Sequence, residues 1–309
     1  MYEKFFFLKE NPFNITPDPK FLYLSDKHGE ALNLLFFGIR ERKGFLLLTG
    51  EVGTGKTTLC RALMDKMDEK IDTALLLNPL LTDIELIKTI NDDFGIGIDG
   101  NSLKDNLDVL NRFLIEGVEN GRNAVVIIDE AQNLSPNTLE MIRLLSNLET
   151  DKSKLLQIIL VGQPELKAKL SLPELRQLNQ RIIVRYHLMP LNHDETKSYI
   201  FNRLAIAGGL GNVSFNPDAL DDIHWASGGI PRLVNILCDR VMLLAFVAEK
   251  RLIEKGMVTN AVNELGKEGV VSLDAGHLPN ERNRLIRYLI YIGILAGIII
   301  FKIFEAVGK

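Results

Sequence analysis

The sequence predicts an α/β fold with a parallel five-stranded sheet, followed by an all-helical second domain and a single C-terminal transmembrane helix. Between residues 45 and 187, short apolar segments alternate with amphipathic helical segments, which is typical of a parallel sheet covered on both faces. After Met189-Pro190-Leu191 the pattern is helical up to about residue 267. A third observation is an apolar segment near the end of the chain, over residues 285–304.

Each element of the core and of the second domain has its own signal. The apolar segments predict strands at Phe45–Thr49, Thr73–Asn78, Ala124–Ile128, Leu156–Val161 and Ile182–His187. Helices are expected over residues 26–41, 192–207, 217–227, 231–249 and 256–266, the last four separated by joints that contain Gly or Pro. The sequence therefore divides into a core over 26–189, a helical domain over 190–267, a polar linker over 268–284, the membrane segment and a tail over 305–309.

The beginning of the chain is expected to be extended. Pro12, Pro17 and Pro19 lie among aromatic residues, so residues 1–25 are predicted to be a turn-rich lead-in that packs on the domain surface. The first residues contain an apolar run of only four and no cleavage site, which does not match a signal peptide. The body of the chain is therefore expected in the cytoplasm.

Composition excludes several classes of protein. With 46% hydrophobic and 25% charged residues the chain can bury an ordinary core, and a net charge of −4 argues against a domain that mainly coats nucleic acid. Cys60 and Cys238 have no metal-like or disulfide-like spacing and are expected to be ordinary buried thiols. The five histidines have no ligand-like spacing either, so no metal is assigned to them.

The apolar C-terminal segment predicts the membrane helix. Tyr288 to Phe301 are fourteen residues without a charge, and the span reaches twenty residues if Arg287 and Lys302 extend toward the interfaces. The alternative is a buried core helix, but this segment lacks the polar face that such a helix normally has. Arginines before the span favour a cytoplasmic N-terminal portion, and Gly293 and Gly297 have the GxxxG spacing that lets two helices approach.

A phosphate-binding motif, the P-loop, follows the first predicted strand. Gly50-Glu51-Val52-Gly53-Thr54-Gly55-Lys56-Thr57 matches G-x-x-x-x-G-K-[ST], and a helix is expected to begin near Lys56. The glycines let backbone N–H groups surround phosphate oxygens, and the helix N-terminus favours negative charge. Lys56 is expected to reach the β- and γ-phosphates and Thr57 to bind Mg²⁺, with Thr58 among the nucleotide contacts. The alternative is a Gly-rich turn that binds nothing.

Two further strands end in polar side chains. Val125 to Ile128 precede Asp129 and Glu130, so both carboxylates are expected at the carboxyl edge of the sheet. Asp129 could hold Mg²⁺, and Glu130 could polarise the attacking water of a hydrolase. Gln163 follows the strand Leu156–Val161 and could contact the γ-phosphate or the water, or could merely stabilise the turn before Pro164.

The ordered set of motifs resembles the AAA+ superfamily. More closely, residues 11–25, 38–45 and 161–166 and the P-loop resemble the general secretion pathway protein A family, also called ExeA, over about residues 1–268. Gln163 departs from the Asn, Ser or Thr usual there in many AAA+ proteins. Membrane-bound family members continue into a periplasmic peptidoglycan-binding region, an activity not expected here because the chain ends five residues after Phe304.

The resemblance gives three arginines candidate roles. Arg181, just before the last strand, is expected to be an arginine finger that acts on a neighbouring subunit's nucleotide, with Arg176 as the second choice. Arg232, in Gly229-Ile230-Pro231-Arg232, resembles the residue through which the helical lid touches phosphate. Either finger candidate could instead be a solvated charge, and Arg232 could be a surface charge at a helix start. His28 and Glu30 lie near where the superfamily holds adenine, but an exposed polar pair is the interpretation preferred here.

Three functions remain open from sequence. The first is a membrane-anchored ATPase that uses ATP and Mg²⁺, forms a homo-oligomer, and drives assembly of a secretion or polysaccharide-export machine at the bacterial inner membrane. The second is a DNA-linked regulator similar to transposition-assisting ATPases, which the membrane segment and the acidic balance disfavour. The third is a nucleotide-gated scaffold with negligible turnover, against which Glu130 argues.

Overall fold

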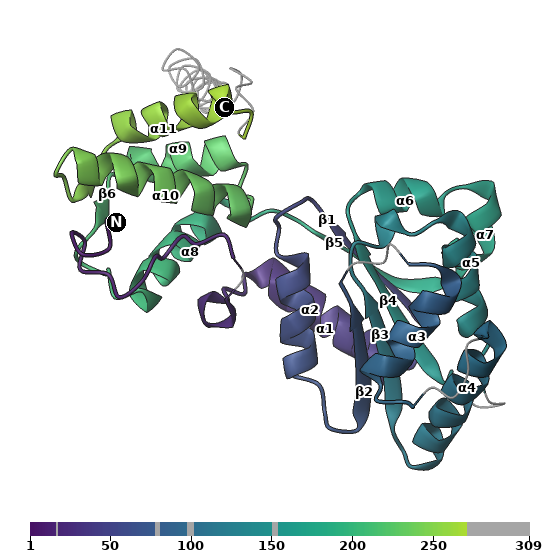
Figure 1. The fold of residues 1–309 in the computed structure, drawn as a ribbon. Helices are drawn as coiled ribbons and strands as arrows, with labels where there is room; N and C mark the ends of the chain where they lie inside the picture. Colours follow the sequence, from purple (N-terminus) through teal and green to yellow (C-terminus); the bar gives the residue numbers. More distant parts are fainter. Residues whose placement is uncertain (17, 78–80, 98–101, 150–153, 271–309) are drawn as a thin grey trace, which may run out of the picture.

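The computed structural model describes residues 1–16, 18–77, 81–97, 102–149 and 154–270, which form a sheet-containing lobe and a helical lobe (Figure 1). The sheet lobe contains β1 (Phe45–Gly50), β2 (Ile71–Leu76), β3 (Asn123–Ile128), β4 (Leu156–Gly162) and β5 (Ile182–Leu188). The strand order is β2-β3-β4-β1-β5, and all four neighbouring pairs are parallel. The predicted parallel five-stranded sheet is confirmed, with every boundary within two residues of its expected position.

Helices cover both faces of the sheet. The helices of this lobe are α1 (Asp26–Arg40), α2 (Lys56–Asp65), α3 (Asp83–Asp93), α4 (Leu103–Glu119), α5 (Pro136–Leu145), α6 (Glu165–Leu170) and α7 (Arg176–Arg181), with short 3-10 turns η1 (Pro19–Phe21), η2 (Ala131–Asn133) and η3 (Pro173–Leu175). Along β1, Leu46 and Leu48 pack with α1 and α2, whereas Phe45 and Leu47 belong to the cluster formed with α3 to α5. Because both faces of the central strands β1, β3 and β4 are buried, these strands are mostly apolar, whereas the edge strands β2 and β5 also carry polar residues.

The second lobe contains α8 (His193–Ile206), α9 (Pro217–Ser227), α10 (Pro231–Val247) and α11 (Lys255–Lys267). These are the four helices expected from sequence. The expectation of an all-helical domain is wrong in one respect, because β6 (Ser214–Phe215) and β7 (Leu252–Ile253) form a small parallel pair. Strands of two residues are too short to produce a periodic apolar pattern.

The first residues of the chain belong to the helical lobe. Tyr2, Phe6 and Phe13 are buried in the same apolar cluster as the inner faces of α8 to α11. The N–H of Lys9 donates to the carbonyl of Ala207 at 2.8 Å. The lead-in therefore contributes to this lobe's core rather than only covering a surface, and the chain passes between the lobes twice, before α1 and after β5 (Figure 1).

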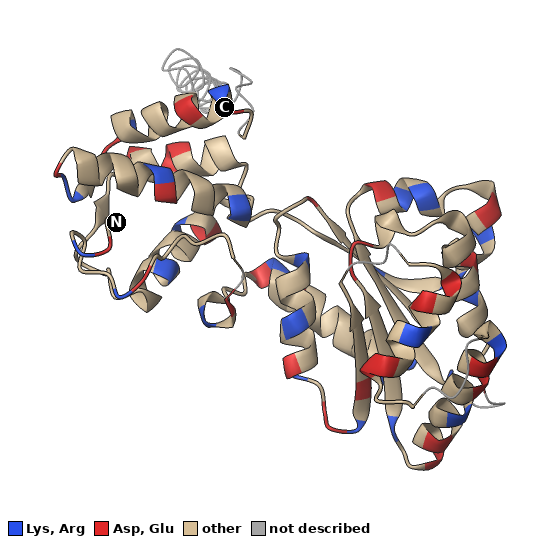
Figure 2. Ribbon diagram, in the orientation of Figure 1, with Lys and Arg blue, Asp and Glu red and all other residues tan. Residues whose placement is uncertain are grey.

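Charged residues of both signs are interspersed along the helices of both lobes (Figure 2). Cys60 and Cys238 are buried free thiols, as expected, and burial raises the pKa of each. The expected membrane helix over residues 285–304 lies outside the part of the chain that the structure describes, as do most of the linker and the tail. Within the described part, none of the helices has the length and apolarity needed to cross a membrane.

Candidate nucleotide-binding site

The P-loop follows β1 at the carboxyl edge of the sheet and ends where α2 begins, at Lys56. Gly53 and Gly55 have φ angles of +82° and +99°, a region that side chains other than glycine rarely adopt. A Cβ at Gly53 would lie 2.6 Å from the Cβ of Arg232, and one at Gly55 would lie 3.1 Å from Nε2 of His28. The loop therefore needs glycine both for its backbone path and for the close approach of two neighbouring elements.

Lys56 is buried in the loop, with 5% of its surface exposed. Its Nζ donates to the backbone carbonyls of Gly50 at 2.8 Å and of Glu51 at 3.0 Å. Burial lowers the pKa of Lys56, and the nearby carboxylates of Glu130 and Asp129 oppose this effect. None of the ion pairs found among the described residues includes Lys56, so its ammonium fits an anionic ligand at this loop.

Thr57 and Asp129 meet across the site. The hydroxyl of Thr57 donates to Oδ2 of Asp129, and Oδ1 of Asp129 accepts from the N–H of Glu130 at 2.9 Å. Burial raises the pKa of Asp129, and these two hydrogen bonds oppose the shift. A hydroxyl and a carboxylate are hard oxygen ligands that fit Mg²⁺. In the described ranges no three His, Cys, Asp or Glu side chains cluster as a metal site, so Mg²⁺ here would need further ligands from nucleotide and water.

Glu130 is held by two amides, one of which was not anticipated. Its Oε2 accepts from Nε2 of Gln132 at 2.5 Å and from Nε2 of Gln163 at 3.2 Å. Oε1 of Gln132 in turn accepts from the N–H of Gln163 at 3.1 Å. Gln132 was missed because it lies in the short turn η2 after β3, where a polar residue has no periodic pattern. Its position two residues after a paired carboxylate at a strand end is the signal that could have found it.

Arg232 brings the helical lobe into contact with the P-loop. Its N–H donates to the carbonyl of Gly53 at 3.3 Å, so the start of α10 lies directly on the loop. A cavity of about 380 Å³ is bounded by residues of both lobes, among them Lys56, Thr57, Glu130 and Arg232. Most of the residues expected to bind nucleotide line this cavity, including Val52 and Thr58, whereas Gly50, Glu51 and Thr54 are not among its lining residues.

The preferred interpretation of His28 as an exposed residue is wrong. His28 is only 5% exposed, its Nε2 lies 3.2 Å from the carbonyl of Thr54, and its Nδ1 lies 2.8 Å from Oγ of Ser25. Burial lowers the pKa of His28, while the hydrogen bond to Thr54 opposes the shift. Glu30 points away and is exposed, where it accepts from Lys27. Helical periodicity alone did not show that the first turn of α1 faces the P-loop.

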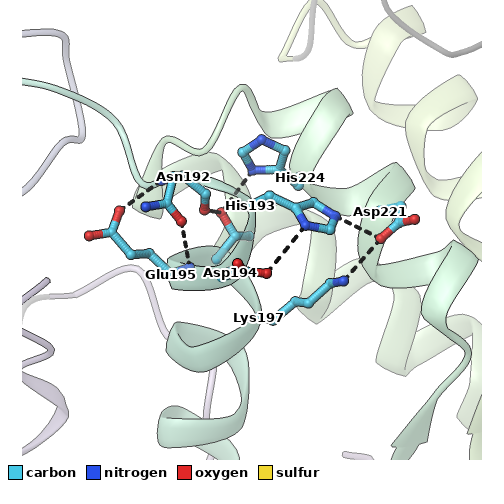
Figure 3. Close-up of polar contacts among 8 residues, drawn as sticks. Asn192, His193, Asp194, Glu195, Lys197, Asp221 and His224 are labelled. Carbon is cyan, nitrogen blue, oxygen red and sulfur yellow. Dashed lines mark hydrogen bonds and ion pairs between the residues drawn. The ribbon is translucent and has the colours of Figure 1, made fainter. Parts of the chain in front are cut away.

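The connection between the two lobes makes close backbone contacts. The N–H of Leu191 donates to the carbonyl of Gly229 at 2.9 Å, which joins the end of the core to the turn before Arg232. Beside this turn, α8 and α9 are linked by polar contacts (Figure 3): His193 Nε2 lies 2.7 Å and Lys197 Nζ 3.2 Å from Oδ1 of Asp221. Oγ1 of Thr196 and Nδ1 of His224 form a further contact of 2.9 Å.

Arg181 is far from its own P-loop. It precedes β5, whose first residue pairs with Phe45, whereas Gly50 pairs with Leu188 at the other end of the strand. Its NH1 donates to Oγ of Ser146 at 2.6 Å and to Oδ1 of Asn147 at 2.7 Å. Arg176 is exposed, and no hydrogen bond or ion pair within the described segments involves its side chain. Arg181 therefore lies at the end of the sheet opposite its own P-loop, and the finger assignment stays a prediction.

The fold is the α/β fold of P-loop AAA proteins, and its P-loop lines a cavity. Residues 39–170 match the family model for the AAA domain. General secretion pathway protein A of Aeromonas hydrophila is 47% identical over 266 residues, which cover 86% of this chain. Over these 266 residues the chain is similar to that protein, in agreement with the resemblance found in the sequence. It spans only 48% of that relative's length.

Solved structures share the fold at much lower identity. Aeropyrum pernix ORC2 aligns with a TM-score of 0.61 at 16% identity, over 83% of this chain and 71% of that one. Drosophila ORC bound to DNA gives 0.62 at 16% identity, over 82% and 64%. Cdc6p of Pyrobaculum aerophilum gives 0.59 at 20% identity, over 81% and 71%. At these identities the similarity concerns the fold alone.

Proposed function

We propose that this chain binds ATP with Mg²⁺ in the P-loop cavity and hydrolyses it. The observation that supports this most is the convergence of Lys56, Thr57, Asp129 and Glu130 at one edge of the sheet, beside a loop in which Gly53 and Gly55 have positive φ angles. Lys56 would bind phosphate oxygens in place of the carbonyls it now contacts. Thr57 and Asp129 would hold Mg²⁺, which neutralises phosphate charge when bound.

Glu130 supports hydrolysis rather than passive binding. Its carboxylate faces the cavity and already accepts two amide hydrogen bonds, so it can be oriented without large rearrangement. A carboxylate in this position can accept a proton from an attacking water. Gln163 would hold Glu130, and could contact the water, from the tip of β4.

We further propose that the helical lobe acts as a lid. Arg232 reaches the cavity from α10, and the hinge at Leu191 and Gly229 connects the lobes. The chain would work as a homo-oligomer, since Arg181 could serve only a neighbouring subunit's nucleotide.

The cellular role proposed is in a secretion or export machine at the bacterial inner membrane, with the ATPase in the cytoplasm. The family name supports the secretion role, and the apolar sequence of residues 285–304 supports a membrane anchor. Sedimentation of membranes from cells that produce the full chain tests the anchor. Recovery of the protein in the supernatant without detergent would contradict it.

The activity itself is tested with purified full-length protein in detergent. ATP affinity is measured by calorimetry with and without Mg²⁺, and phosphate release is followed at saturating ATP. Magnesium-dependent binding with turnover above the buffer background supports the proposal. Binding without turnover would support the scaffold instead.

A further inference from the structure

Arg203 lies in α8 with 6% of its surface exposed. Its Nε donates to the carbonyl of Pro12, NH1 donates to the hydroxyl of Tyr199 at 2.9 Å, and NH2 donates to the carbonyl of Asn14 at 3.2 Å. The guanidinium also lies 4.7 Å from the ring centre of Phe21 and 5.6 Å from that of Tyr199. One buried arginine thus contacts both the lead-in and the helical lobe.

This guanidinium has unused binding capacity. It carries five N–H donors, and the three hydrogen bonds to protein atoms use three of them. None of the ion pairs found among the described residues includes Arg203. Burying a cation without a carboxylate is costly, and the cost falls if an anionic ligand supplies the missing partner.

The position of Arg203 shows where such a ligand would lie. It borders the cavity of about 380 Å³ at the P-loop and also a narrower cavity of about 80 Å³. The narrower cavity has a largely apolar wall that includes Phe21, Leu22 and Leu191, as a base would need. Arg203 is the one cation among the described residues that lines both cavities.

The charged side chains that line the larger cavity favour the binding of an anionic ligand. Among its described lining residues the cations are Lys56, Arg203 and Arg232, and the carboxylate is Glu130. Lys56 lies in the loop and Arg232 at the start of α10, which leaves Arg203 at the junction of the two cavities. A nucleotide with its base in the narrow cavity and its outer phosphates at the P-loop would place ribose and α-phosphate at that junction.

We propose that Arg203 is a nucleotide-binding residue whose free N–H groups contact the α-phosphate, the group that AMP, ADP and ATP share. The inference rests on the proposed function, and it assigns a residue that no motif marks. Guanidinium matches phosphate oxygens with paired, charge-assisted hydrogen bonds. Arg203 thereby links occupancy of the cavity to the lead-in, through its contacts with Pro12 and Asn14.

The test compares ligands that differ by one phosphate. Adenosine, AMP, ADP and a non-hydrolysable ATP analogue are titrated in competition with a fluorescent ADP analogue, using full-length wild type and Arg203→Met. Loss of a charge-assisted contact should weaken AMP, ADP and the ATP analogue by a similar factor, about tenfold or more. Adenosine, which lacks the α-phosphate, should change by less than about twofold, since it cannot make that contact.

Arg251→Met is the matched control, because Arg251 stacks on Phe5 and Phe7 of the lead-in but does not line either cavity. It should leave all four affinities at the wild-type level. Circular dichroism and thermal unfolding check the fold of each variant. If Arg203→Met does not fold, Arg203→Lys replaces it, and the expected result is a smaller loss of AMP affinity relative to adenosine.

Three results would overturn the inference. Equal weakening of adenosine and AMP would show that Arg203 only holds the lead-in in place. Weakening of the ATP analogue alone would move the contact to the γ-phosphate. Unchanged affinities would remove Arg203 from the site, whereas a wild type that binds none of the nucleotides would refute the proposed function itself.

Discussion

Two adjacent glycines at the hinge provide a controlled test of how the lobes are joined. Gly228 and Gly229 have φ angles of +58° and +71°, so alanine at either position costs about 1–2 kcal/mol in backbone strain. A Cβ at Gly228 would meet nothing within 4 Å, whereas a Cβ at Gly229 would lie 2.0 Å from the carbonyl oxygen of Leu191. That overlap cannot persist, so Gly229→Ala must also break the 2.9 Å bond from Leu191 to Gly229.

Losing that buried hydrogen bond adds about 1–3 kcal/mol. The expected loss in free energy of unfolding is therefore about 1–2 kcal/mol for Gly228→Ala and about 2–5 kcal/mol for Gly229→Ala. Urea unfolding followed by circular dichroism measures both. Because Arg232 follows three residues later, Gly229→Ala should also weaken ATP binding, while Gly228→Ala should not. If Gly228→Ala and Gly229→Ala lowered the free energy of unfolding equally and had equal ATP affinities, the close approach of Gly229 to Leu191 would be refuted.

Three further predictions concern single side chains. Gln132→Leu removes one of the two amide donors to Glu130, so kcat at saturating ATP should fall by roughly tenfold while ATP affinity holds; an unchanged kcat would show that Gln132 does not position the carboxylate. Burial, partly opposed by the Thr54 carbonyl, lowers the pKa of His28 below its usual value of about 6.5. As the pH falls the unfolded chain is then protonated first, so the free energy of unfolding should decrease below about pH 6.5, and His28→Gln should flatten this dependence in urea titrations between about pH 7 and 5. An identical slope in both proteins would count against a buried neutral His28. Arg181→Ala should bind ATP but hydrolyse it slowly, and mixing it with Lys56→Ala should restore partial activity that depends on protein concentration. If co-assembled mixtures stay inactive, Arg181 is not a finger in trans.

Much of the core was predictable because its signals are local. The strand containing Phe45 to Thr49 is apolar on both faces, so a continuous apolar run marks it, and the motif from Gly50 to Thr57 fixes the turn and the start of α2. Asp129 and Glu130 follow from the same reasoning, because parallel strands end at one edge.

Long-range contacts account for what the sequence could not show. His28 faces the P-loop only because α1 packs beside α2, and Gln132 approaches Gln163 only because β3 and β4 are neighbours. Arg203 contacts Pro12 and Asn14 only because the lead-in folds back across α8. None of these contacts produces a periodic pattern within a single segment of the sequence.

The central claim is that Lys56 binds phosphate while Glu130 acts only in turnover. The most direct measurement is ATP affinity together with phosphate release for wild type, Lys56→Ala and Glu130→Gln, with the exposed Lys66→Ala and Glu174→Gln as charge-matched controls. The account predicts that Lys56→Ala loses binding, that Glu130→Gln retains binding without turnover, and that both controls behave as wild type. Equal loss of binding in Lys56→Ala and Glu130→Gln, or undiminished turnover in Glu130→Gln, would contradict it.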